Sequence, residues 1–306
     1  MRDPLPAMRV LVPDDPERRE LEPLPDGVEL GVIGGAEPRL DDVEMLVAAP
    51  HVEELAGLLE RLPALRVVQA VSAGVDWLLP LVPDGVVVCD AAGVHDIPVA
   101  EWVLAAVLAS LRRIPECRDL QRGKLDSLPR QAELAGRRVL ILGYGSIGRA
   151  VEARLAGFDV EVTRVARRAR DGVHATSEIP SLLGGTDVLV LLLPLTSETE
   201  HIVERELLGR LPDGALVVNA GRGGLVDQPA LLAELEAGRL HAALDVTDPE
   251  PLPPEHPLRS APGTLITPHV AGDSPQFPTR AYRLVRDQIA RYAAGEPLLN
   301  VVENGY

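Results

Sequence analysis

The sequence predicts an α/β protein with two domains, each built on a parallel sheet. Three observations predict this fold class. Short β-rich runs alternate with helical periods along the chain, several runs are apolar throughout, and 306 residues are many for a single core. Apolar runs such as DVLVLLLP (187–194) and RRVLILG (137–143) are typical of strands buried on both faces, as in parallel sheets covered by helices.

The elements follow in order along the chain. Strands are predicted in the first part at 8–13, 44–49, 66–71 and 85–91. In the second part they are predicted at 137–145, 160–166, 187–194, 215–221, 241–247 and 264–271. The main helical segments are predicted at 51–62, 97–118, 146–158, 198–211, 228–240 and 280–296. The polar segment 119–136 is predicted to be irregular and to cross the surface.

Composition excludes several classes of function. The chain has 30 Lys and Arg against 46 Asp and Glu, a net charge of −16, which argues against binding to nucleic acid or to an anionic membrane surface. Two cysteines form no disulfide framework, and no Cys/His spacing predicts a metal site. No signal peptide is seen, and no apolar run reaches the ~18 residues of a spanning helix. We expect a soluble cytoplasmic protein.

A glycine motif predicts a dinucleotide site. Gly143, Gly145 and Gly148 form G-x-G-x-x-G between an apolar strand and a helical pattern, which is the context that the motif requires. The first glycine permits the turn, the second lets the backbone approach a pyrophosphate, and the third allows close packing. The intervening Tyr144, Ser146 and Ile147 complete the loop, and the helix that starts after Ser146 offers free N–H donors. A glycine-rich turn without a ligand is the alternative.

Basic residues follow where an NAD site would have an acid. The carboxylate that holds the ribose 2′-hydroxyl of NAD is expected about 20 residues after the first glycine. Arg164 occupies that place, and Arg167 and Arg168 follow it. Guanidinium groups there would bind a 2′-phosphate, which predicts NADP(H) in preference to NAD(H). A solvated basic loop is the alternative, and Glu161 is expected inside the strand, away from the ribose.

Three polar residues predict the chemistry. Arg222, Glu250 and His269 each follow an apolar strand, and therefore belong to the carboxyl edge where open α/β sheets bind ligands. Hydride transfer to a 2-oxo acid needs a cation for the carboxylate and carbonyl, and an acid that protonates the oxygen. Histidine suits the second task, and a carboxylate behind it orients the ring. Taken singly, each residue has an ordinary structural explanation.

The motifs together resemble the D-isomer-specific 2-hydroxyacid dehydrogenase family, in particular its glyoxylate/hydroxypyruvate reductase-like branch. They are SAGVDWL (72–78), LGYGSIG (142–148), LPLTSET (193–199), NAGRGGLVD (219–227), ALDVTDPEPLP (243–253) and TPHVAG (267–272). The resemblance covers nearly the whole chain. It implies two Rossmann-like or flavodoxin-like domains with an interdomain cleft: a substrate domain over 1–98 plus 274–306, and a dinucleotide-binding domain over 99–273.

The resemblance also implies roles for individual residues. His269 is expected as the acid/base, Glu250 as its support and Arg222 as the substrate-binding cation, also near the cofactor. Backbone amides at Ser72, Ala73 and Gly74 are expected to hold the substrate carboxylate, and Asp245 to meet the nicotinamide amide. Other expected cofactor-lining residues are Leu193, Pro194, Thr199, Ala220, His269 and Gly272. Family members are usually homodimers through the nucleotide domain, and the apolar stretch from Trp102 to Leu111 suits such an interface or a buried helix.

Several functions stay open from the residues alone. The first is reduction of glyoxylate, hydroxypyruvate or a similar small 2-oxo acid with NADPH. A dinucleotide-sensing, corepressor-like binding protein without turnover is a second, because a fold does not determine a function. The same chemistry on phosphoglycerate, formate or phosphite is a third. Arg164 and the proline-containing segment DSPQFPTRAYR (273–283) are departures from the family pattern, and the second puts the substrate in doubt.

Overall fold

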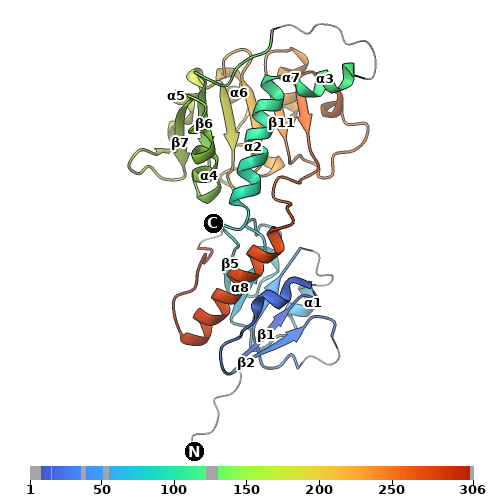
Figure 1. The fold of residues 1–306 in the computed structure, drawn as a ribbon, viewed down its shortest axis with the longest axis vertical. Coiled ribbons are helices and arrows are strands. Elements are labelled where there is room, and N and C mark those ends of the chain that lie inside the picture. The colour runs from blue at the N-terminus through green and yellow to red at the C-terminus, as the bar shows by residue number, and fades with distance from the viewer. Residues whose placement is uncertain (1–7, 15, 36–38, 51–54, 122–129, 304–306) are drawn as a thin grey trace, which may run out of the picture. The chain divides into compact units, whose positions relative to one another are not determined.

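The computed structural model describes residues 8–14, 16–35, 39–50, 55–121 and 130–303. The chain divides into two compact units, of which unit 1 comprises Met1–His95 and Ser274–Tyr306 and unit 2 comprises Asp96–Asp273. The first boundary lies between His95 and Asp96, slightly before the predicted boundary after residue 98. Each unit contains one parallel sheet (Figure 1), which confirms the predicted α/β class.

Unit 1 is built on a five-stranded sheet in the order β2-β1-β3-β4-β5. The strands are β1 Met8–Val12, β2 Val28–Val32, β3 Val43–Ala48, β4 Val67–Ala70 and β5 Val87–Cys89. Helix α8 (Phe277–Ala294) lies along one face of this sheet (Figure 1), and α1 (Leu55–Leu59) covers the other. Successive strand residues serve opposite faces, since Val10 packs with α8 while Leu11 packs with α1. The helix predicted at 51–62 ends at Leu59, and its residues 51–54 lie outside the described residues.

Unit 2 is built on a seven-stranded sheet in the order β12-β11-β10-β9-β6-β7-β8. The strands are β6 Arg138–Leu142, β7 Glu161–Ala166, β8 His174–Ala175, β9 Val188–Leu191, β10 Leu216–Asn219, β11 His241–Leu244 and β12 Thr264–Ile266. Strand β6 is paired in parallel with both β7 and β9, so the chain reverses its direction of winding at β6. The carboxyl edge beside β6 is thus the topological switch point where such sheets bind ligands.

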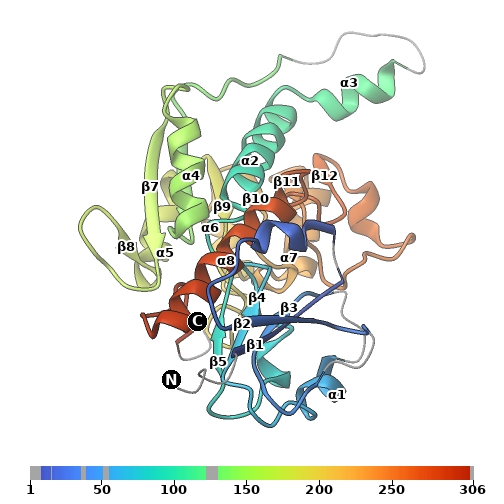
Figure 2. The same cartoon turned by 60° about the horizontal axis from the view of Figure 1, so that its bottom comes forward.

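Helices cover both faces of the second sheet. On one face lie α2 (Asp96–Leu111) and α4 (Ser146–Leu155), which are side by side in Figure 2. On the other lie α5 (Ile179–Leu182), α6 (Arg205–Arg210) and α7 (Gln228–Glu236). Because apolar side chains from both faces of β6, β9 and β10 are enclosed, these strands are buried almost throughout, as their sequences predict.

Two helical predictions need correction. The stretch predicted as one segment over 97–118 is two helices, α2 and α3 (Ile114–Leu120), because Arg113 between them is left-handed, with φ of 51°. The segment predicted over 198–211 is helical only in α6, after a turn at 196–202. The surface segment predicted at 119–136 begins inside α3, and its residues 122–129 lie outside the described part.

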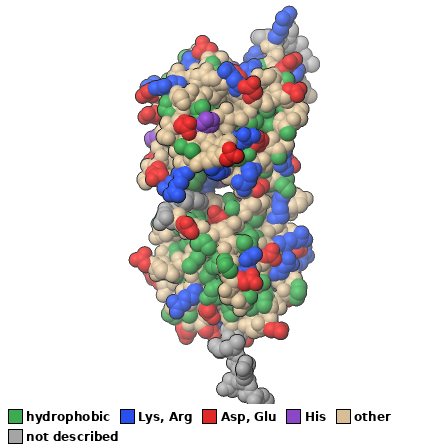
Figure 3. All heavy atoms as spheres, turned by 90° about the vertical axis from the view of Figure 1, so that its left-hand side faces the viewer, with side chains coloured by type: hydrophobic (Ala, Val, Ile, Leu, Met, Phe, Trp, Pro, Cys, Tyr) green, Lys and Arg blue, Asp and Glu red, His purple; other side chains and the backbone are tan. Residues whose placement is uncertain are grey.

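Short 3₁₀ helices complete the secondary structure: η1 Pro16–Leu21, η2 Leu79–Leu81, η3 Thr176–Glu178, η4 Leu183–Gly185, η5 Gly223–Leu225 and η6 Pro257–Ser260. None of the described helices is long and apolar enough to cross a membrane. Over the same described ranges, no group of three or more His, Cys, Asp or Glu side chains is arranged to hold a metal ion. On the face drawn in Figure 3, acidic and basic side chains are interspersed.

Candidate active site

The glycine loop joins β6 to α4 and is shaped by close backbone packing. A Cβ on Gly143, whose φ is 110°, would lie 2.5 Å from the carbonyl carbon of Leu192. A Cβ on Gly148 would lie 2.7 Å from the oxygen of Gly143. By contrast, a Cβ on Gly145 would have no heavy atom within 4 Å. The first and third glycines are thus required by the fold, whereas the second leaves open space at the amino end of α4, where a pyrophosphate fits.

Arg164 lies inside β7 and not at its end. Strand β7 continues to Ala166, as predicted, so Arg164, the position counted from Gly143, lies two residues before the end of the strand. The Arg164 Nε donates to both carboxylate oxygens of Glu152 on α4, at 3.0 and 2.9 Å. This hydrogen bonding lowers the pKa of Glu152 and raises that of Arg164. Glu161 is the first residue of β7, at the opposite edge of the sheet from the ligand side.

Arg167 and Arg168 are the residues that directly follow β7. Both are exposed. The Arg167 Nη2 lies 3.2 Å from an oxygen of Glu198, in a pair whose side chains are 55% and 66% exposed. Ion pairs this exposed contribute little free energy, so a bound phosphate would compete for Arg167 at small cost.

Arg222, Glu250 and His269 follow the three neighbouring strands β10, β11 and β12. The last residues of these strands, Asn219, Leu244 and Ile266, are in register across the sheet, so the segments that follow start at one edge. His269 and Glu250 are in contact through Nδ1 of the ring and Oε1 of the carboxylate. Glu250 was expected to support His269, and this contact is the interaction through which it can do so.

The backbone around Arg222 is held by its neighbours. The Asn219 side chain donates to the oxygen of Arg222 at 2.8 Å and accepts from the amide of Gly221 at 3.0 Å. A Cβ on Gly223 would lie 2.1 Å from the oxygen of Thr247, so only glycine fits after Arg222. The Arg222 guanidinium donates to the oxygen of Gly221 at 2.8 Å. These contacts define the direction in which the Arg222 side chain leaves the strand end.

Asp245 organises the segment that carries His269. Its side chain is buried, and it accepts from the Thr267 hydroxyl at 2.5 Å and from the amides of Val270 and Ala271 at 2.9 and 2.8 Å. His269 itself has a φ of 54°, and its amide donates to the oxygen of Asp245 at 2.8 Å. Asp245, predicted to meet the nicotinamide amide, therefore holds the His269 turn in this structure.

The other predicted cofactor-lining residues lie after β9, β10 and β12. Leu193 is buried at the end of β9, with Pro194 next to it. The Thr199 hydroxyl donates to the oxygen of Pro194 at 2.7 Å and accepts from the amide of Thr196 at 2.8 Å, which closes the turn. Ala220 and Gly272 are half-buried beside Arg222 and His269 in the sequence.

Ser72, Ala73 and Gly74 form a loop after β4 in unit 1. The Ser72 hydroxyl donates to the oxygen of Gly74 at 2.8 Å. The Trp77 indole donates to the same oxygen at 3.0 Å and to the Ser72 hydroxyl at 3.3 Å. The Trp77 ring packs on the hydrophobic cluster below the loop. Two side chains thus clamp the loop backbone.

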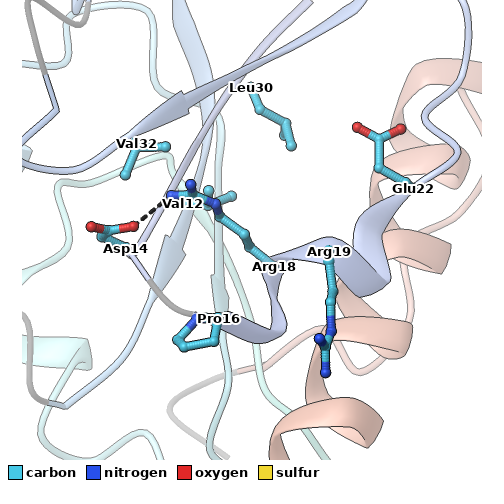
Figure 4. A pocket seen from close by; sticks show the side chains of 8 residues that line it. All are labelled: Val12, Asp14, Pro16, Arg18, Arg19, Glu22, Leu30 and Val32. Carbon is cyan, nitrogen blue, oxygen red and sulfur yellow. Dashed lines mark hydrogen bonds and ion pairs between the residues drawn. The ribbon is translucent and has the colours of Figure 1, made fainter.

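Two hollows contain none of these residues. One, of about 660 Å³, lies in unit 1 next to the carboxyl ends of β1 and β2 (Figure 4), where Arg18 pairs with Asp14 at 2.5 Å. The other, of about 600 Å³, lies in unit 2 near the amino ends of β10, β11 and β12. Neither therefore belongs to the predicted site, which lies at the opposite, carboxyl edge of the second sheet.

Sequence reasoning missed four residues that organise these loops: Glu152, Arg170, Glu198 and Trp77. Three of them act on residues distant in the sequence, and no motif spacing links such pairs. Trp77 and Glu198 lie within the quoted SAGVDWL and LPLTSET motifs, so only their roles were missed.

Comparison with known proteins identifies the family. Residues 104–271, more than half of the chain, match the model of the D-isomer specific 2-hydroxyacid dehydrogenase NAD-binding domain. Hydroxyphenylpyruvate reductase of Plectranthus scutellarioides is 34% identical over 270 residues, covering 86% of each chain.

Solved structures agree with this match. A D-isomer specific 2-hydroxyacid dehydrogenase of Xanthobacter autotrophicus, in complex with NADPH and MES, has a TM-score of 0.85 at 32% identity, covering 97% of this chain and 99% of its own. An NADPH-dependent glyoxylate/hydroxypyruvate reductase of Sinorhizobium meliloti, in complex with NADP and sulfate, has a TM-score of 0.84 at 32% identity, covering 98% and 100%. The predicted resemblance is confirmed: this chain belongs to the D-isomer-specific 2-hydroxyacid dehydrogenase family, whose members are enzymes that use a nicotinamide dinucleotide.

Proposed function

We propose that this enzyme reduces a small 2-oxo acid of the glyoxylate or hydroxypyruvate type, with NADPH preferred over NADH. The observation that carries the proposal is the contact between His269 and Glu250 at the strand edge that also bears Arg222. The enzyme class makes the sensing, corepressor-like alternative the weaker one. Phosphoglycerate, formate and phosphite remain as alternative substrates.

The three side chains have separate tasks in the proposed reaction. The dinucleotide supplies the hydride when bound. The Arg222 guanidinium binds the substrate carboxylate and polarises the carbonyl. Because Nδ1 of His269 contacts Glu250, Nε2 is the atom that gives its proton to the substrate oxygen. Glu250 keeps the ring in this orientation, and the loop at Ser72–Gly74 is proposed to bind the substrate carboxylate through its amides.

The proposed cofactor preference rests on the basic turn. Arg167 and Arg168 follow β7 directly. The last residue of that strand, Ala166, offers no carboxylate to bind a ribose 2′-hydroxyl. Arg164 is engaged by Glu152, so we assign the direct phosphate contacts to Arg167 and Arg168, with Arg164 as support. Two of the similar structures hold NADPH or NADP.

Initial rates with purified protein test the proposal. We expect turnover of glyoxylate and hydroxypyruvate with an NADPH preference of about tenfold or more, or about 1.4 kcal/mol. Arg222→Ala and His269→Ala should lose nearly all turnover and retain NADPH binding, whereas His241→Ala, at the opposite edge of the sheet, should stay active. Turnover retained in either site variant would refute the residue assignment. A preference for NADH would refute only the cofactor assignment.

Two further expectations belong to the same proposal. We propose a homodimer formed through unit 2 and a cytoplasmic location. Packing of α2 on the sheet already explains its apolar residues Val99, Val103 and Val107, while Ile97 and Ile114 are 46% and 54% exposed. Light scattering of the full chain measures the mass directly, and a monomer at micromolar concentration would refute the dimer.

A further inference from the structure

The segment that carries Arg167 and Arg168 contains a hydrogen-bonded turn. Residues 167–173 connect β7 to β8. The amide of Arg170 donates to the oxygen of Val173 at 3.0 Å, and the amide of Val173 donates back to the oxygen of Arg170 at 2.8 Å. These bonds fix Arg170 to Val173, the residue directly before β8.

The turn and the glycine loop meet at Tyr144. The Tyr144 ring has the Arg164 guanidinium carbon 5.7 Å and the Arg170 guanidinium carbon 6.0 Å from its centroid. The Arg170 Nη2 also donates to the Tyr144 backbone oxygen at 2.7 Å. The amides of Gly143 and Tyr144 both donate to the oxygen of Val165 at 2.9 Å, so the loop is already fastened to β7. Arg170, in the middle of the 167–173 turn, adds a further contact to the glycine loop.

Arg164 and Arg170 meet different partners. Arg164 is paired with the Glu152 carboxylate, which also contacts the Tyr144 hydroxyl. Arg170 meets a backbone oxygen and a ring face, and both of these are formally uncharged. Arg164 is thus paired with a carboxylate of α4, whereas Arg170 links the turn to the backbone of the glycine loop.

We propose that Arg170 is a positioning residue for cofactor selection: it fastens the 167–173 turn to the glycine loop. The inference rests on the proposed preference for NADPH. The 2′-phosphate and the pyrophosphate of NADP belong to one adenosine, so the groups that bind them must keep a matched spacing. Arg170 maintains that spacing through the Tyr144 oxygen, and this preorganisation lowers the entropy lost on binding.

Two small probes isolate the 2′-phosphate. Adenosine 2′,5′-bisphosphate and 5′-AMP share the adenosine and the 5′-phosphate and differ only at the 2′ position. We expect Arg170→Met, which keeps the apolar stem, to weaken bisphosphate binding by about five- to tenfold and 5′-AMP binding by less than about twofold. Calorimetry on the full chain measures both. Arg210→Met removes another exposed arginine, on α6, and should change neither.

A second variant series separates positioning from direct contact. In an Arg167→Ala/Arg168→Ala background, Arg170→Met should cause no further loss of bisphosphate affinity, because Arg170 acts through those residues. An additive loss would show that Arg170 contacts the phosphate itself and would overturn the proposal. Equal losses for both probes, or no loss for either, would also overturn it. Wild-type protein that binds both probes equally would refute the NADPH preference, and this inference with it.

Discussion

The glycine loop of unit 2 and the Ser72–Gly74 loop of unit 1 each follow a buried parallel strand, yet they are held by different means. Backbone atoms of Leu192, Leu193 and Gly143 leave no room for a Cβ on Gly143 or Gly148. In unit 1 the loop is instead clamped by the side chains of Trp77 and Ser72. One loop excludes side chains, and the other depends on them.

This difference explains why one loop is a recognisable motif. Steric exclusion allows only glycine at certain positions, so the spacing of glycines is visible in the sequence. The hydrogen-bonded loop of unit 1 depends on the position of the Trp77 indole in the folded chain. The spacing of residues in the sequence does not reveal that position. The variants below test this difference, in order of decreasing expected effect.

Gly143→Ala should have the largest effect. The new methyl group would overlap the Leu192 carbonyl at a backbone angle that alanine rarely adopts. We expect a loss of about 3 kcal/mol of folding free energy from the combined overlap and strain. Thermal unfolding of the full chain would show it as a lower midpoint, and an unchanged midpoint would show that the backbone at Leu192, directly after β9, moves without cost.

Gly145→Ala should leave folding intact and weaken cofactor binding. A methyl group here meets no protein atom within 4 Å and projects into the proposed pyrophosphate position. We expect an unchanged unfolding midpoint and a rise in the NADPH Kd of about tenfold or more, or at least about 1.4 kcal/mol. If Gly145→Ala binds NADPH with the wild-type Kd, the open space beside Gly145 is not the pyrophosphate position.

Trp77→Phe should loosen the clamp of the unit 1 loop. Phenylalanine keeps the aromatic packing and loses the indole N–H that donates to the Gly74 oxygen. One lost hydrogen bond corresponds to about 1 kcal/mol, so we expect the KM for the 2-oxo acid to rise about fivefold. NADPH binding should not change. Trp102→Phe on α2 is the matched control and should keep the wild-type KM. A wild-type KM in Trp77→Phe would show that the Trp77 N–H has no part in substrate binding.

Glu152→Gln should have the smallest effect, and a pH-dependent one. Hydrogen bonds from Arg164 lower the pKa of Glu152 in the folded protein. Its contribution to stability is therefore present above the unfolded pKa of about 4.3 and is lost as pH falls below it. For a partly exposed pair we expect less than about 1 kcal/mol at pH 7. Unfolding midpoints of the two proteins should converge only as pH falls through the lowered pKa of Glu152 in the folded protein, and a constant difference would refute the ionic contribution.

Strands that are buried on both faces were predictable, as were the edge strands β5 and β12, whereas the edge strands β2 and β8 were not. Strand β9 is apolar throughout and was predicted within a few residues. Strand β2 was missed because it lies at a sheet edge, is partly exposed and has the weak sequence VELGV. Strand β7 was predicted over 160–166 and spans Glu161–Ala166, but the pairing of Arg164 with Glu152 on the neighbouring helix was not predicted.

The amino-acid sequence by itself determined the α/β class, the glycine turn and the order of Arg222, Glu250 and His269 after successive strands. It could do so because burial and steric exclusion act on each residue locally, and therefore leave a pattern along the chain. Only the tertiary structure decided that His269 contacts Glu250, that Asp245 holds the His269 turn and that Arg164 is paired with Glu152. Such contacts join residues distant in the sequence, and their partners follow from the geometry of the folded chain.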